Sequence, residues 1–141
     1  MKDRLKVVLD TNVLLVSISS RSKYHWIYDK LLADEYDLFV TNEMLLEYEE
    51  IISLKYNSSV AREVIKSLLI LPNVYKTFIY YNWNLIVEDA NDNKFIDCAI
   101  NSNSHLLVTQ DKHFDVIKGI DFPKIEILSI NGFAKQFGIN F

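Results

Sequence analysis

Acidic residues occupy four positions in this sequence where a carboxylate would lie in apolar surroundings. Asp10 and Asp111 come shortly after runs of apolar residues that are typical of buried strands. Glu47 and Asp92 fall inside the apolar stripes of two segments with helical periodicity. A buried charge without a partner is costly, so each of these carboxylates is expected to bind a base or a cation.

A shared cation would explain all four positions if the side chains converge. Like charges at close range coexist only when protons or metal ions compensate them. Carboxylate oxygens, in a sequence with one cysteine and without a histidine pair, are typical of sites for hard cations such as Mg²⁺ or Mn²⁺. Such ions serve phosphoryl chemistry, because they activate water and stabilise the attacking and leaving oxygens.

Projection at 100° per residue shows which acids are out of place on the two helices. In the segment Asn91–Ser102, Asp92 lies near the middle of the apolar stripe, whereas Lys94 projects onto another face. In the segment Glu43–Leu54, Glu47 lies within the apolar face. The two helices are therefore expected to present one acid each toward the core side.

Each acid also has a simpler alternative. Asp10 and Asp111 could be ordinary turn residues at strand ends, where aspartate is common. Glu47 could pair with Lys55 or with another base, and Asp92 could serve only as a helix cap. These alternatives stay open at this point, although all four would have to hold together to remove the metal site.

The elements that must position these acids alternate along the chain. Strands are expected at 5–9, 38–40, 74–80, 106–108 and 125–128. Helices are expected at 24–33, 43–54, 60–71, 91–102 and 129–137, with a loop or ragged helix end at 17–23. This alternation predicts one α/β domain over residues 1–141, a three-layer α/β/α sandwich around a mostly parallel sheet. Ligands of such sheets bind outside the carboxyl ends of the strands.

Composition restricts the setting of this domain. The 15 basic and 19 acidic residues give a formal net charge of −4, whereas proteins that bind nucleic acid are usually basic. A site that gathers carboxylates around cations is an exception, because it becomes electropositive once loaded. The single cysteine excludes a disulfide scaffold and a cysteine-based zinc cluster. Without a signal peptide or a membrane-spanning run, a cytoplasmic protein with no membrane association is expected.

Four segments in order resemble a known family. They read V-V-L-D-T-N-V-L-L at 7–15, T-N-E-M-L-L-E-Y-E-E at 41–50, D-A-N-D-N-K-F-I-D-C-A-I at 89–100 and H-L-L-V-T-Q-D at 105–111. Together they resemble the PIN-domain nucleases, in particular the bacterial VapC-like proteins that are toxin components of toxin–antitoxin pairs. The resemblance spans nearly all of the chain.

The resemblance implies a PIN-like fold in which the first and fourth strands are adjacent. It implies that Asp10, Glu47, Asp92 and Asp111 are the catalytic acids that bind Mg²⁺ or Mn²⁺ in an endoribonuclease. It also implies an RNA substrate, an antitoxin partner and a homodimer or higher homo-oligomer. Two alternatives remain: an RNA-processing PIN nuclease without an antitoxin, and a catalytically inactive PIN domain that binds RNA or protein.

Five further residues are candidates around these acids. Asn12 and Thr109 match polar family positions and are expected to orient the carboxylates or metal-bound water, with local turn bonds as the alternative. Asp97 projects beyond the apolar stripe, which favours a solvated face over an outer metal ligand. His113 could contact phosphate or assist proton transfer, and Lys112 could contact an RNA backbone. Exposed loop positions are the alternative for both.

Overall fold

The computed structural model describes residues 4–86, 92–104 and 106–139. Its five-stranded sheet has the order β3-β2-β1-β4-β5, and every described strand pair is parallel. The strands are β1 (Lys6–Leu9), β2 (Asp37–Val40), β3 (Val74–Lys76), β4 (Leu106–Val108) and β5 (Glu126–Leu128). The adjacency of β1 and β4 confirms the strand order that the family resemblance implied.

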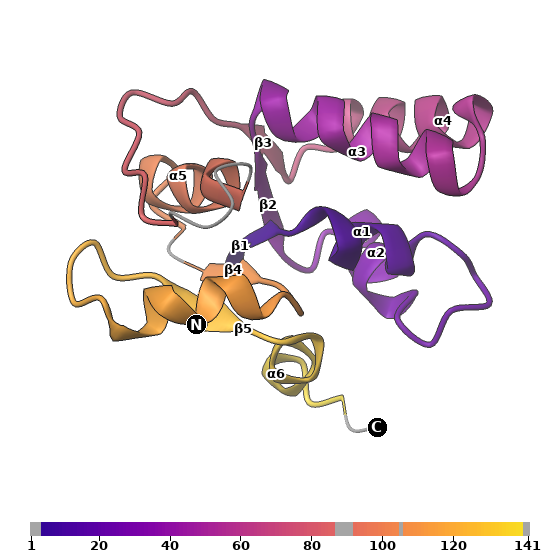
Figure 1. Ribbon diagram of the computed structural model, residues 1–141. Coiled ribbons are helices and arrows are strands. Elements are labelled where there is room, and N and C mark those ends of the chain that lie inside the picture. The colour runs from indigo at the N-terminus through magenta and orange to yellow at the C-terminus, as the bar shows by residue number, and fades with distance from the viewer. Residues whose placement is uncertain (1–3, 87–91, 105, 140–141) are drawn as a thin grey trace.

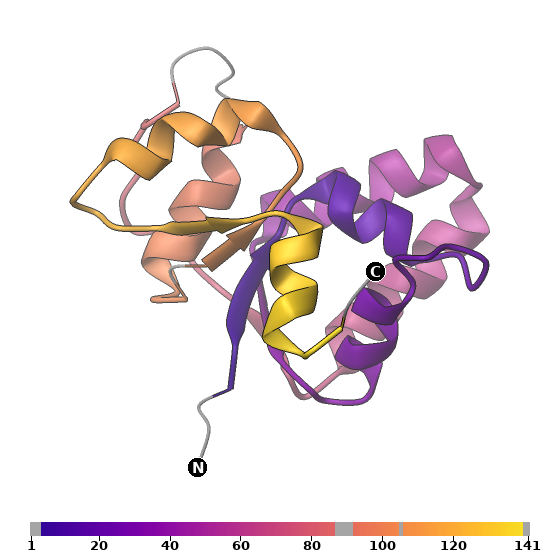
Figure 2. The same ribbon diagram turned by 90° about the horizontal axis from the view of Figure 1, so that it is seen from below.

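Helices cover both faces of this sheet. The helices are α1 (Thr11–Ser17), α2 (Trp26–Leu32), α3 (Asn42–Lys55), α4 (Ser58–Ile70), α5 (Asn93–Asn101), α6 (Ile130–Gln136) and the 3-10 helix η2 (Lys112–Gly119). Figures 1 and 2 show α5 and η2 on one side of the sheet and α1, α2 and α6 on the other. The expected three-layer α/β/α arrangement is therefore confirmed. No helix in the described ranges has the length and apolar character needed to cross a bilayer.

β1 is the central strand and sets the position of the candidate site. Val8 pairs with Leu107 of β4, and Val7, Val8 and Leu9 have no exposed surface. Directly after β1, the N–H of Asp10 donates to the carbonyl of Val108 at 3.0 Å. Because parallel strands end at the same edge of a sheet, the residues that follow β1 and β4 lie side by side.

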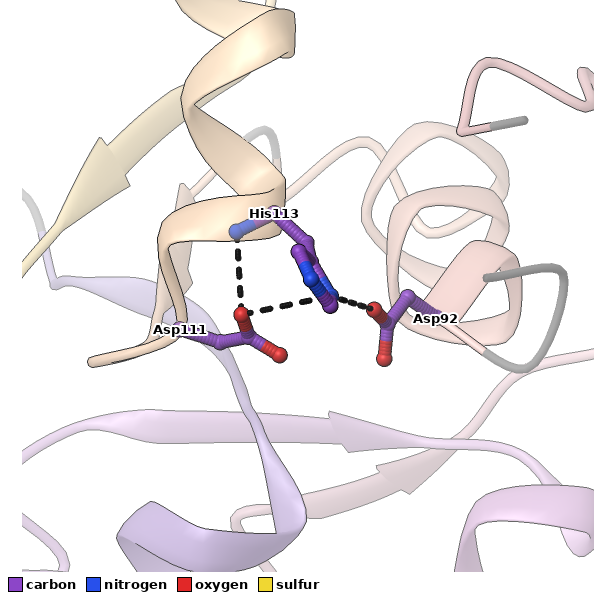
Figure 3. A group of neighbouring side chains, drawn as sticks. All are labelled: Asp92, Asp111 and His113. Atoms are coloured by element: carbon purple, nitrogen blue, oxygen red, sulfur yellow. Dashed lines mark hydrogen bonds and ion pairs between the residues drawn. The ribbon is translucent and has the colours of Figure 1, made fainter. Parts of the chain in front are cut away.

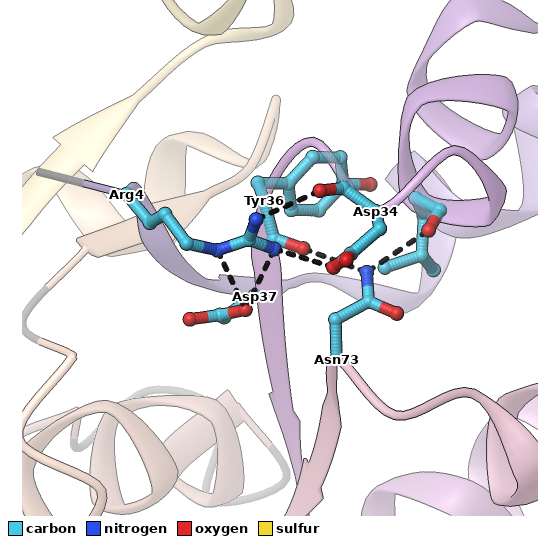
Figure 4. A network of polar contacts seen from close by, with 6 residues as sticks. Arg4, Asp34, Tyr36, Asp37 and Asn73 are labelled. Atoms are coloured by element: carbon cyan, nitrogen blue, oxygen red, sulfur yellow. Dashed lines mark hydrogen bonds and ion pairs between the residues drawn. The ribbon is translucent and has the colours of Figure 1, made fainter. Parts of the chain in front are cut away.

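A polar network fixes the opposite edge of the sheet, where the strands begin (Figure 4). Arg4 precedes β1, and its guanidinium lies 2.9 Å from Asp37 at the start of β2 and 2.7 Å from Asp34. Asn73 precedes β3, and its amide donates to the carbonyl of Tyr36 at 2.8 Å. Polar residues thus tie together the beginnings of three strands, at the end of the sheet away from Asp10.

The structure differs from the expected elements after β3. The strand expected over 74–80 ends at Lys76, because the chain leaves the sheet and continues along α5. The side chains of Asn93, Asp97 and Asn101 hold this segment by its backbone, at Ile86, Trp83 and Tyr80. The covering segment buries a second face of α5, so that residues 93–99 are all buried. α1 and η2 are helices at positions where the sequence predicts none.

Candidate metal centre

Asp10 lies at the carboxyl end of β1, with 7% of its surface exposed. Its Oδ2 accepts a hydrogen bond of 2.7 Å from the Thr109 hydroxyl, which follows β4. Burial raises the pKa of Asp10 to about 6; the Thr109 hydrogen bond opposes the rise, and the negative charges of Asp92 and Asp111 add to it. The charges of three acids from distant parts of the sequence therefore act on one another at this edge of the sheet.

Asp92, Asp111 and His113 form a compact group (Figure 3), and the charges of its two acids act on Asp10. Asp92 directly precedes α5, and Asp111 directly precedes η2. Nδ1 of His113 lies 3.5 Å from an oxygen of Asp92 and 3.5 Å from an oxygen of Asp111. One ligand atom from each of the three residues lies within 4.8 Å of the other two. The sequence left open whether His113 is only an exposed loop residue. In the structure it lies in η2 and faces Asp92 and Asp111.

The fourth acid, Glu47, is held by two neighbours. Its Oε1 lies 2.8 Å from Nζ of Lys94, whose side chain is only 6% exposed. Its Oε2 accepts a hydrogen bond from the Thr11 hydroxyl at the start of α1. Glu47 therefore takes up a base, as one alternative from the sequence allowed, and the base is Lys94 on α5.

The two candidate positioning residues differ in their surroundings. The Thr109 hydroxyl donates to Asp10 and accepts the backbone N–H of Asp111 at 3.0 Å, so it links two of the acids. Asn12, the second residue of α1, is exposed. Thr109 is thus placed to orient carboxylates, and the expected role of Asn12 stays a prediction.

Asp97 does not lie on a solvated face, so that expectation is wrong. Its surface is 4% exposed, and its carboxylate accepts the backbone N–H of Trp83 at 2.9 Å. Burial raises the pKa of Asp97 above its usual value. Lys112, in contrast, is exposed at the start of η2. The structure gives Asp97 a role in holding the segment that covers α5.

Helical projection misses Lys94 because it assumes one buried face for this helix, and Thr11 is missed because the sequence predicts no helix where α1 begins. α5 is buried on several faces, so Lys94 is buried although it projects away from the apolar stripe. A signal was present in the spacing of Asn93, Asp97 and Asn101, which recur every four residues. Such a row of polar side chains can bind an extended backbone segment lying along the helix.

The donor set of this centre fits a hard divalent cation. Asp10, Asp92 and Asp111 offer carboxylate oxygens, and His113 adds one imidazole nitrogen. Adjacent ligands of an octahedral ion with bonds of about 2.1 Å lie about 3 Å apart, which is close to the 3.5 Å contacts of His113. A bound Mg²⁺ or Mn²⁺ would also offset the repulsion between the charge of Asp10 and those of Asp92 and Asp111.

Known structures share this fold at low sequence identity. VapBC2 from Rickettsia felis, solved with a promoter DNA fragment, matches with a TM-score of 0.62 and 18% identity over 88% of this chain and 98% of that one. VapC20 from Mycobacterium tuberculosis matches with a TM-score of 0.60 and 12% identity over 81% of this chain and 95% of that one. FitAcB from Neisseria gonorrhoeae matches with a TM-score of 0.57 and 15% identity over 88% of this chain and 97% of that one.

Sequence comparison gives a more specific result. No curated protein matches this chain. The PIN domain family, however, matches residues 6–113, a range that contains all four predicted acids together with Thr109, Lys94 and His113. The match covers well over half of the sequence and coincides with the strands and helices that build the centre. On this evidence the chain belongs to the PIN domain family.

Proposed function

We propose that this protein is a metal-dependent endoribonuclease that hydrolyses RNA phosphodiester bonds. The observation that carries the proposal is the meeting of Asp10, Asp92 and Asp111 at the carboxyl edge of the sheet. The PIN domain match over residues 6–113 supports it. The resemblance to PIN-domain nucleases implies that these acids form one site, and carboxylate oxygens are ligands that Mg²⁺ and Mn²⁺ prefer.

In this proposal the four acids and Thr109 have different roles. Mg²⁺ or Mn²⁺, when bound, supplies a polarised water and stabilises charge on the phosphate oxygens. Asp10, Asp92 and Asp111 hold the ion, and Glu47 is the fourth acid of the site. Thr109 keeps the Asp10 carboxylate in place through its 2.7 Å hydrogen bond. Fixed donors and ligands of this kind lower the barrier because they need no reorganisation during the reaction.

His113 has a second role in this proposal. Nearly half of its side chain is exposed, while its Nδ1 faces Asp92 and Asp111. The imidazole can therefore contact both the metal centre and solvent. It is placed to exchange a proton with the attacking water or with the leaving oxygen. Lys112, exposed next to it, is placed to contact an RNA phosphate.

The solved structures that share this fold support a proposal for the biological setting. VapC20 is described as a toxin that cleaves the sarcin-ricin loop, and VapBC2 was solved on DNA from its promoter. By analogy, this chain is the toxin of a toxin–antitoxin pair in the cytoplasm, with an antitoxin protein as partner and a homodimer or higher homo-oligomer as its assembly. A small reading frame for an antitoxin beside the gene is the expected genetic sign.

Cleavage of mixed RNA by the purified full chain tests the proposal. We expect cleavage with Mn²⁺ or Mg²⁺, none after addition of a chelator, and a loss of at least about 100-fold in Asp111→Asn. Asp115→Asn is the matched control, because Asp115 is an exposed acid on the same helix that pairs with Lys118. Folded protein that cleaves no RNA with either ion contradicts the enzymatic proposal.

One observation favours a second function. Glu47, one of the four acids, already has Lys94 and Thr11 as partners. A PIN domain whose fourth acid is permanently neutralised could bind RNA or protein without cutting it. RNA binding that persists in chelator, together with the absence of any cleavage, would favour this function over the nuclease. Cleavage without any antitoxin gene would favour an RNA-processing enzyme.

A further inference from the structure

A buried lysine lies among the acids of the candidate centre. Lys94 is on α5, two residues after Asp92, and its side chain is 6% exposed. Its Nζ lies 2.8 Å from Glu47 Oε1 and 5.2 Å from the centre of the Phe95 ring. Burial of an ammonium group is costly unless a fixed opposite charge compensates it. Lys94 therefore supplies a fixed positive charge to this site, whether or not a metal ion is also bound.

Glu47 has both oxygens engaged. Lys94 faces Oε1, and the Thr11 hydroxyl donates to Oε2. A divalent ion on Oε1 would lie within about 5 Å of the ammonium, the sum of a metal–oxygen bond of about 2.1 Å and the ion-pair distance of 2.8 Å. Two positive charges at that distance repel strongly in a partly buried site.

The other acids are arranged differently. Asp92 and Asp111 gather around His113, and one ligand atom of each residue lies within 4.8 Å of the others. Asp10 acts on this group through its charge. Asp92, Asp111 and His113 are thus close enough to share one ion, whereas Glu47 is already paired with Lys94.

We infer that Lys94 takes the place at Glu47 that a second metal ion would occupy, so that each chain binds a single divalent ion, at Asp92, Asp111 and Asp10. This inference rests on the proposed function and deepens it, because it gives the stoichiometry of the metal site. Lys94 acts through Glu47 and is a positioning residue. It neutralises the charge of the Glu47 carboxylate and holds its Oε1 in an ion pair.

The charges of the centre agree with a single ion. Counted by themselves, Lys94 and the four carboxylates, when these are ionised, have a formal charge of −3. One divalent ion changes this sum to −1, and a second ion would change it to +1. Lys94 also has little room to withdraw, because residues 93–99 of α5 are all buried. A lysine in such a position keeps its charge at Glu47 during metal binding.

Metal stoichiometry of the full-length chain, titrated with Mn²⁺ by calorimetry, tests the inference. Bound Mn²⁺ is counted independently by electron paramagnetic resonance. We expect one ion per chain in the wild type and two in Lys94→Gln, since Glu47 then needs a new cation. The control is Lys118→Gln, which removes an exposed lysine paired with Asp115 and leaves one ion per chain.

A double variant keeps the test decisive if Lys94→Gln does not fold. Glu47→Gln with Lys94→Met removes both charges of the pair, and such a paired replacement is often neutral for stability. It should still bind one ion, with an affinity within about 10-fold of the wild type. Loss of that ion would show that Glu47 is a ligand and would overturn the inference.

The remaining outcomes separate the inference from the proposed function. Two ions in the wild type, or one ion in folded Lys94→Gln, overturn the inference and leave a metal-dependent nuclease intact. A wild-type chain that binds no Mn²⁺ and cleaves no RNA overturns both.

Discussion

Thr109 Oγ1 donates a 2.7 Å hydrogen bond to Oδ2 of Asp10, a residue 99 positions earlier in the chain. The bond joins the ends of β1, the central strand of the sheet, and of its neighbour β4. The same hydroxyl oxygen accepts the backbone N–H of Asp111 at 3.0 Å. One small side chain therefore orients a buried carboxylate and fixes the turn that carries a second one.

Replacement of Thr109 by valine, which has a similar shape, should weaken metal binding. The hydroxyl lowers the pKa of Asp10, so its removal should raise that pKa further above about 6. The pH at which Mn²⁺ binding reaches half of its maximum should therefore move upward, and affinity at pH 7 should fall by roughly 10-fold. Thr109→Ser, which keeps the hydroxyl, should behave as the wild type. An unchanged pH midpoint in Thr109→Val would contradict this role.

The metal-free protein should lose stability as the pH rises through the pKa of Asp10. Its pKa is about 6 in the folded chain and 3.8 as the ordinary value, so the folded state binds more protons in between. The stabilising contribution is complete below about pH 4 and is lost above about pH 6, by about 3 kcal/mol. Urea unfolding in chelator at several pH values measures this, and Asp10→Asn should remove that part of the dependence.

The sequence predicts the parallel sheet and predicts that Asp10 and Asp111 lie at the same edge of it. β1 and β4 are continuous apolar runs, and strand ends in parallel sheets meet at one edge, so Asp10 and Asp111 were expected together. Glu47 and Asp92 were singled out because periodicity separates a charge on an apolar stripe from a charge on an exposed face. These arguments are local, and local patterns are what a single sequence records well.

The burial of Lys94 and Asp97 depends on a contact that local patterns do not record. The sequence predicts a strand that extends to Tyr80, but the segment after β3 turns onto α5 and covers a face that helical projection assigns to solvent. The side chains that hold this segment are polar, so they resemble an exposed face. Only the path of the chain distinguishes the two cases.

Asn93 should contribute more to stability than Asn101, although both bind the covering segment. The Asn93 amide accepts the N–H of Ile86 and donates to its carbonyl, each at 2.8 Å, in a buried setting. Asn93→Ala leaves both backbone groups without these bonds and should cost about 2–4 kcal/mol. Asn101 binds exposed backbone, so Asn101→Ala should cost about 1 kcal/mol or less. If urea unfolding gives the same loss of unfolding free energy for both variants, burial of the bonded backbone does not determine the size of the loss.

Asp92→Asn distinguishes a metal ligand from a structural acid, because the two roles predict opposite results in two assays. The change is nearly isosteric and removes one negative charge from the group with Asp111 and His113. If Asp92 holds the metal, RNA cleavage should fall at least about 100-fold, since a misplaced ion loses transition-state stabilisation. The melting temperature of the metal-free chain should stay the same or rise, because the charge of Asp92 acts unfavourably on Asp10. If Asp92 only pairs with His113, the variant should melt earlier and still cleave. Full cleavage with a lowered melting temperature would therefore remove Asp92 from the metal site, and Asp115→Asn should change neither assay.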